Sequence, residues 1–280
     1  MNSYWDQFFL RHLFLTFFLF FVTIAIAHAS IDDSYSPTGW IETKGDHFVV
    51  LCATQEDEEW ARDILNHAES YYNDIADDIG YVRYQNFWTW EKRVKIVLFR
   101  SQESYVQQTG QPAWSNGYAN VYSEMFKSRI IVSYKGQPDF LEVILPHEIT
   151  HLILHDFINR PFPRFFDEGV AQLEQKDESL NHKDVVSRLI TEGKGLAVQD
   201  LLNYDLGAHK SDAKAVAIFY IESLYIVDFL IKTYGKDSFK ELCRHLRDGD
   251  NFEQALKAAY YPSLDSIQML QDKWFDYAKQ

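Results

Sequence analysis

The sequence VILPHEITHLILHDF, residues 143–157, gives the strongest indication of the fold. Its apolar residues recur at steps of three and four, which predicts a helix. Pro146 fits that helix only near its start or at a kink, because proline has no amide hydrogen to donate. Residues 147–151, HEITH, form an HExxH pattern. Its two histidines lie one helical turn apart on one face, so both imidazoles can reach a single metal ion.

Glu148 follows the first histidine and therefore points beside a bound metal rather than at it. A general base has to lie there in order to take a proton from a metal-bound water. A catalytic zinc ion usually has three protein ligands and one position open to water or substrate. With His147 and His151 as two ligands, the chain must provide a third.

Three arrangements compete for the third ligand. His155 continues the four-residue series, but it lies about 12 Å along the helix axis from His147, too far to share one ion. We expect His155 instead to interact with the helix-end carbonyls or the helix dipole. A metzincin would have glycine at position 154 and histidine at position 157. This chain has Leu154 and Phe157 there, which excludes that class.

The third arrangement uses Glu168, which lies 17 positions after His151. The intervening residues 156–163, DFINRPFP, contain two prolines and can turn the chain back, so that a second helix presents Glu168 to the metal. Gly169 would let this second helix pack closely against the first. Asp167 has two interpretations, an acid that orients a ligand histidine or a solvated surface acid.

The rest of the pattern predicts a small sheet followed by a helical half. Residues 30–45 are polar and are expected to form a short lead-in. The expected fold class is α+β, with a small mixed β-sheet lobe, a mainly helical lobe and the active-site helix at the cleft. Together with the HExxH pattern, this arrangement resembles a zincin-like fold. Strands are expected at 47–53, 95–99, 118–122 and 129–134, and helices at 56–79, 101–109, 139–155, 164–175, 181–192, 212–233, 236–247 and 263–279.

The N-terminus carries a segment that we expect to be removed. Residues 13–27, LFLTFFLFFVTIAIA, are uncharged and lead into AHA at residues 27–29. Small residues at these positions before Ser30 suit signal peptidase, which predicts a signal peptide at 1–29 and export to the periplasm or the medium. The alternative is a membrane anchor at 13–27, although 15 residues fall short of the roughly 20 that a spanning helix needs.

Composition restricts the partners. Residues 30–280 suffice for one domain, with 30–138 as its α/β part and 139–280 as its helical part. The net charge of −14 argues against nucleic acid and anionic membrane surfaces, because both attract basic patches. Contact with a membrane is expected only if the N-terminal segment stays uncleaved. The two cysteines, Cys52 and Cys243, are equally compatible with one disulfide and with two inert buried thiols.

The two motifs together resemble the gluzincin metallopeptidases, the group that contains thermolysin and aminopeptidase N. HEITH at 147–151 and FFDEGVA at 165–171 are most similar to the peptidase MA-like family. The likeness covers most of residues 30–280, including QTGQPAWSNGYA at 108–119 and FYIESLYIVDFLIKTYG at 219–235. It implies one Zn²⁺ held by two histidines and an acid, here His147, His151 and Glu168, with Glu148 as the base.

The same resemblance implies a tyrosine that stabilises the oxyanion from a downstream helix. Tyr220 matches this tyrosine best, and Tyr225 is its nearest competitor. RIIVSY, residues 129–134, resembles the strand that pairs with an extended substrate in zincins. The chain departs from the aminopeptidases in its shorter spacer before Glu168 and in having NGYAN, residues 116–120, where they have a GAMEN-type segment. Aminopeptidase specificity is therefore not implied.

The expected function is hydrolysis of peptide bonds in a peptide or protein substrate, through a zinc-bound water that Glu148 activates. The alternative is a non-catalytic module of the same fold that contains zinc and binds peptides or partners. Glu148 argues against this alternative, because a binding module does not need a base.

Overall fold

The computed structural model describes residues 40–81, 88, 92–112, 115–123, 128–137, 139–175, 183–209 and 212–280. The chain divides into two compact units: unit 1 comprises Met1–Ala76 with Val82–Leu152, and unit 2 comprises Asp77–Tyr81 with Ile153–Gln280. The expected signal peptide and its alternative, a membrane anchor, lie outside the described residues. Within the described ranges, no helix has both the length and the apolar character that a membrane span requires.

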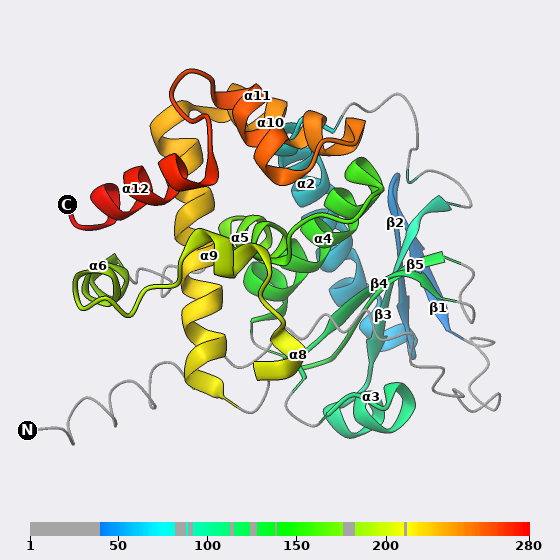
Figure 1. Ribbon diagram of the computed structural model, residues 1–280. Helices are drawn as coiled ribbons and strands as arrows, with labels where there is room; N and C mark the ends of the chain where they lie inside the picture. Colours follow the sequence, from blue (N-terminus) through cyan, green and yellow to red (C-terminus); the bar gives the residue numbers. More distant parts are fainter. Residues whose placement is uncertain are drawn as a thin grey trace, which may run out of the picture. The chain divides into compact units, whose positions relative to one another are not determined.

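Unit 1 contains a five-stranded sheet with the strand order β1-β2-β3-β5-β4 (Figure 1). β2, β3 and β5 are parallel, whereas β1 and β4 run antiparallel to their neighbours, so the expected mixed sheet is confirmed. β1 lies in the segment expected to be a lead-in. It is short and half-buried, and its polar sequence gave no strand signal. The strands are β1 Ile41–Lys44, β2 Phe48–Cys52, β3 Val94–Phe99, β4 Tyr118–Ser123 and β5 Ser128–Tyr134.

Helix α2, Glu58–Ile79, packs on one face of this sheet (Figure 1). Its Tyr72 stacks on His47 at 4.0 Å between ring centroids and meets the ring of Phe48 edge-on at 6.2 Å. Alternate strand residues point to the opposite face, as the two-residue period of a strand requires. There they form a cluster with Tyr105 of helix α3, Gln102–Thr109. Both faces are therefore covered, which explains the almost continuous apolar runs of the central strands.

The expectation that residues 129–134 form the substrate-pairing strand is wrong. β5 pairs with β3 on one side and with β4 on the other, so neighbouring strands already use its backbone groups. The chain runs through β4 first and then inserts β5 between β3 and β4. The strand at this edge of the described sheet is β4, where Val121 and Tyr122 are about half exposed.

Unit 2 is mainly helical, and the expected α+β class is confirmed. The expected helix at 263–279 corresponds to α12, whereas α7, α8 and α11 were not anticipated. A capping box between Asn251 and Gln254 begins α11, and this sequence signal was available. The helices after α4 are α5 Arg164–Leu173, α6 Lys183–Thr191, α7 Val198–Leu202, α8 Leu206–His209, α9 Ala213–Tyr234, α10 Lys236–Asp248, α11 Phe252–Tyr260 and α12 Ile267–Ala278.

In unit 2, α5 packs closely against α9. A Cβ atom at Gly169 would lie 2.4 Å from the carbonyl oxygen of Ser223, so this position requires glycine. Gln172 Nε2 donates to the carbonyl oxygen of Tyr220 at 2.9 Å. The expectation that Gly169 serves close packing is therefore correct, but its close neighbour is on α9 rather than on the HExxH helix.

The two cysteines are free and buried, Cys52 on β2 of unit 1 and Cys243 on α10 of unit 2. Burial raises the pKa of both thiols, most strongly that of Cys243. Thiols protonated in this way are poor nucleophiles. The structure thus has the two inert thiols rather than the disulfide.

Candidate metal centre

The HExxH residues lie in the first half of helix α4, Leu145–Ile158. A π-helical turn, Phe140–Ile144, leads directly into this helix, and Pro146 lies at the junction, where a missing amide hydrogen costs little. Thr150 Oγ1 donates to the carbonyl oxygen of Pro146 at 2.8 Å. Unit 1 ends at Leu152 within α4, so both histidines of the motif belong to unit 1.

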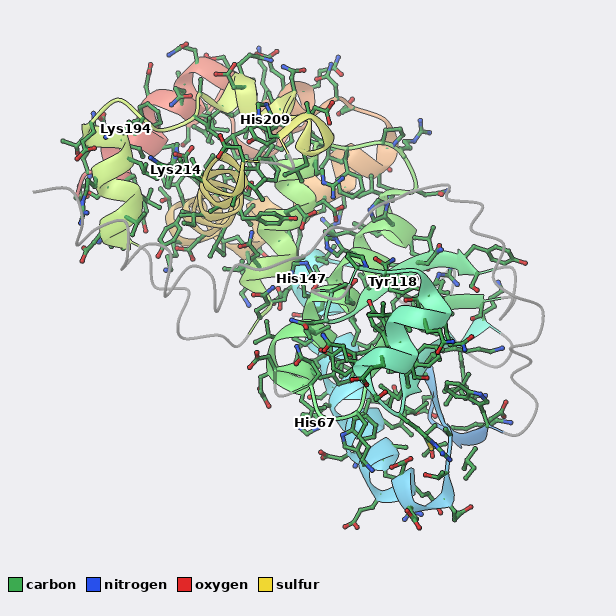
Figure 2. All side chains as sticks on the ribbon, turned by 90° about the horizontal axis from the view of Figure 1, so that it is seen from below. His67, Tyr118, His147, Lys194, His209 and Lys214 are labelled. Atoms are coloured by element: carbon green, nitrogen blue, oxygen red, sulfur yellow. The ribbon has the colours of Figure 1, made fainter. Side chains whose placement is uncertain are left out.

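The two histidines are buried and point toward one another. His147 and His151 are 0% and 2% exposed, and their Nε2 atoms lie 3.0 Å apart (His147 is labelled in Figure 2). Nitrogen ligands about 2.0–2.1 Å from a tetrahedral ion lie about 3.3 Å from each other. The observed separation is therefore close to what one shared ion requires.

Glu168 completes a group that could hold a metal ion. One ligand atom each from His147, His151 and Glu168 lies within 4.8 Å of the other two. Glu168 comes from α5 and is 0% exposed. A buried carboxylate needs a compensating positive charge, and two neutral imidazoles with one carboxylate form a common donor set for a catalytic metal. The donor chemistry therefore fits a divalent ion.

Glu148, the residue after His147 on α4, is also 0% exposed. Tyr105 of α3 is electrostatically coupled to it. Burial raises the pKa of Tyr105, and the negative charge of Glu148 raises it further. Tyr105 Oη lies 2.6 Å from Ser115 Oγ. Glu148 thus lies in the neighbourhood of the Tyr105 hydroxyl, which also belongs to unit 1.

Tyr220 lies on α9 near Glu168, the carboxylate of the metal group. Burial, followed by the Glu168 carboxylate, raises the pKa of this tyrosine well above its ordinary value, so its hydroxyl keeps its proton at neutral pH. The packing of α5 on α9 accounts for this neighbourhood, since Gln172 and Gly169 lie on the same helix as Glu168. Tyr225, the competing tyrosine, is half-buried one turn further along α9.

His155 and Asp167 contact each other, a pairing that the sequence did not predict. His155 Nε2 lies 3.1 Å from Asp167 Oδ2. Asp167 is 8% exposed, so the interpretation as a solvated acid is wrong. His155 stays outside the metal group, as its distance along the helix predicted. The pair thus connects the second half of α4 to α5, immediately before Glu168.

Arg164 is the residue at this site that sequence reasoning missed. It is the first residue of α5, and its Nη2 lies 3.3 Å from Glu168 Oε1. It also donates a hydrogen bond to Tyr220. The four-residue spacing from Arg164 to Glu168 on a helix was the available signal, because such residues are neighbours on the helix surface.

Comparison with known proteins assigns the chain to a family. The family model of the Peptidase MA superfamily matches residues 93–280, which include the whole metal group and helix α9. An uncharacterised protein of Bacillus subtilis (strain 168), YhcO, is 26% identical over 131 residues. That match covers 45% of this chain and 38% of the relative, well under half the relative's length. Because the family model covers most of the chain, this protein belongs to the Peptidase MA superfamily.

Proposed function

We propose that the protein is a zinc metallopeptidase of the gluzincin type, in which His147, His151 and Glu168 hold one zinc ion. The observation that carries this proposal is the approach of their ligand atoms to within 4.8 Å of one another. Two imidazoles and a carboxylate suit zinc, and three protein ligands leave a position for water or substrate. The buried base Glu148 favours catalysis over mere metal storage.

When bound, zinc would lower the pKa of a coordinated water and polarise the scissile carbonyl. Glu148 would accept a proton from the attacking water and return it to the leaving amine. The Tyr220 hydroxyl would donate a hydrogen bond to the oxyanion, since the raised pKa of this tyrosine keeps it protonated. Burial of these groups keeps bulk water away from the proton transfer.

Glu148→Gln tests the proposal against a zinc-containing binding module. The variant keeps the shape of the side chain and loses the base, so zinc content should be unchanged while peptide hydrolysis falls about 10²- to 10⁴-fold. The measurement is cleavage of a mixed peptide library by the wild type, with chelator, and after zinc is restored. Wild-type protein that binds zinc and peptides but cleaves none of the library would favour the binding module.

The proposal includes export, with cleavage after Ala29 and a mature chain in the periplasm or the medium. The AHA sequence at 27–29 and the short apolar run at 13–27 support it. N-terminal sequencing of the protein from its native host should find Ser30 first. A chain that begins at Met1 and fractionates with membranes would support the anchor instead.

A further inference from the structure

The α5–α9 pair places one cation between two groups of the proposed site. Arg164 lies 3.3 Å from Glu168 Oε1 through Nη2, and its side chain is 34% exposed. It also donates to the Tyr220 hydroxyl, which is buried on α9. Gly169 and Gln172 fix the separation of α5 and α9, so the three side chains are held by packed backbone rather than by a loop.

The chemistry of the guanidinium group determines which partner donates in the hydrogen bond between Arg164 and Tyr220. Arginine carries only donors and stays charged at any physiological pH. In its hydrogen bond with Arg164, the Tyr220 oxygen must therefore accept. The hydroxyl hydrogen of Tyr220 is then directed to a different acceptor. An oxyanion that forms near the Glu168 carboxylate is such an acceptor.

We propose that Arg164 is a positioning residue, which orients the Tyr220 hydroxyl as a donor to the oxyanion and offsets part of the negative charge of Glu168. This inference rests on the proposed function and deepens it. It assigns no contact with substrate to Arg164. It predicts opposite effects on two properties that a purely structural residue would change together.

Turnover is the first of these properties. In Arg164→Met, which keeps the length of the side chain and removes its donors, we expect kcat to fall about 10-fold with little change in KM. In a Tyr220→Phe background the same substitution should change kcat less than about 2-fold, because the hydroxyl that it orients is already absent. Arg164→Lys keeps the charge but not the planar fork, so its kcat should lie between those of the wild type and Arg164→Met.

Zinc affinity is the second property, and it is measured without turnover by competition with a chromophoric chelator. Removing a cation beside a ligand carboxylate should tighten zinc binding about 3- to 10-fold. If Arg164 only anchored α5, its loss would weaken zinc binding. The control is Lys232→Met, which removes another four-residue ion pair, with Asp228 on α9, and should change neither property.

The possible outcomes separate the two proposals. Wild-type protein that binds no zinc and cleaves no peptide overturns the proposed function and this inference together. An active, zinc-binding wild type overturns the inference alone if Arg164→Met matches it in kcat and affinity, binds zinc more weakly, or has an additive effect with Tyr220→Phe. A lower kcat, tighter zinc binding and non-additivity with Tyr220→Phe support it.

Discussion

The two units hold their candidate functional side chains in different ways. In unit 1, His147, Glu148 and His151 lie within five consecutive positions of one helix, so helix geometry alone relates them. In unit 2, Arg164, Glu168 and Tyr220 come from two helices, and their relation depends on how α5 packs against α9. The first arrangement survives any change that keeps α4 helical. The second depends on particular packing contacts, and it is the more vulnerable to substitution.

Tyr220→Phe tests whether unit 2 takes part in the chemistry. Loss of one oxyanion donor should lower kcat about 10²- to 10³-fold, while zinc content and KM change little. The measurement is steady-state cleavage of the best library peptide. Tyr225→Phe serves as the matched variant on the same helix. If Tyr225→Phe has the large effect and Tyr220→Phe does not, the assignment of the oxyanion donor is reversed.

Gly169→Ala tests the dependence on packing. The added Cβ would lie 2.4 Å from the Ser223 carbonyl oxygen, which is backbone and cannot move aside cheaply. We expect a loss of about 3 kcal/mol in the free energy of unfolding, measured by denaturant titration. At Gly207 the Cβ would meet only a side-chain oxygen of Asp205 at 3.1 Å, so Gly207→Ala is the control and should have a much smaller effect. Equal stability of the two variants would contradict the packing account.

Glu222→Gln tests the cost of a buried acid on α9. Burial raises the pKa of Glu222 from 4.5 to about 8, and its Oε2 accepts from the Leu196 amide at 2.9 Å. Between these two values the folded chain holds a proton that the unfolded chain has lost, so stability falls as pH rises through this window. Glutamine keeps the acceptor and has no proton to lose.

The variant should therefore match the wild type in stability near pH 4 and exceed it near pH 9 by about 5 kcal/mol. Thermal unfolding of both chains across this range measures the difference. A constant difference at every pH would mean that Glu222 does not titrate as its burial predicts.

The contrast between the units also explains what could be predicted from the sequence. HExxH was recognisable because residues four apart lie on one face of a helix, and strands β2, β3 and β5 were recognisable from their apolar runs. The contact between Arg164 and Tyr220 has no spacing rule, since it depends on the packing of α5 against α9. β5 gave a strong strand pattern, but its position inside the sheet depends on chain order rather than on composition.

The pair of His155 and Asp167 illustrates the same limit. The rise per residue of a helix was enough to exclude His155 as a metal ligand, and the structure agrees. Its partner could not be predicted, because Asp167 reaches it only after the chain has passed through the turn with Pro161 and Pro163. The sequence thus predicted which residues to exclude better than it predicted contacts between helices.

The central claim is tested most directly by zinc content, measured by atomic emission on the purified wild type, His151→Ala and His155→Ala. The account predicts one zinc ion per chain in the wild type and in His155→Ala, and none in His151→Ala. Wild-type protein without stoichiometric metal, or His151→Ala with full zinc content, would contradict it.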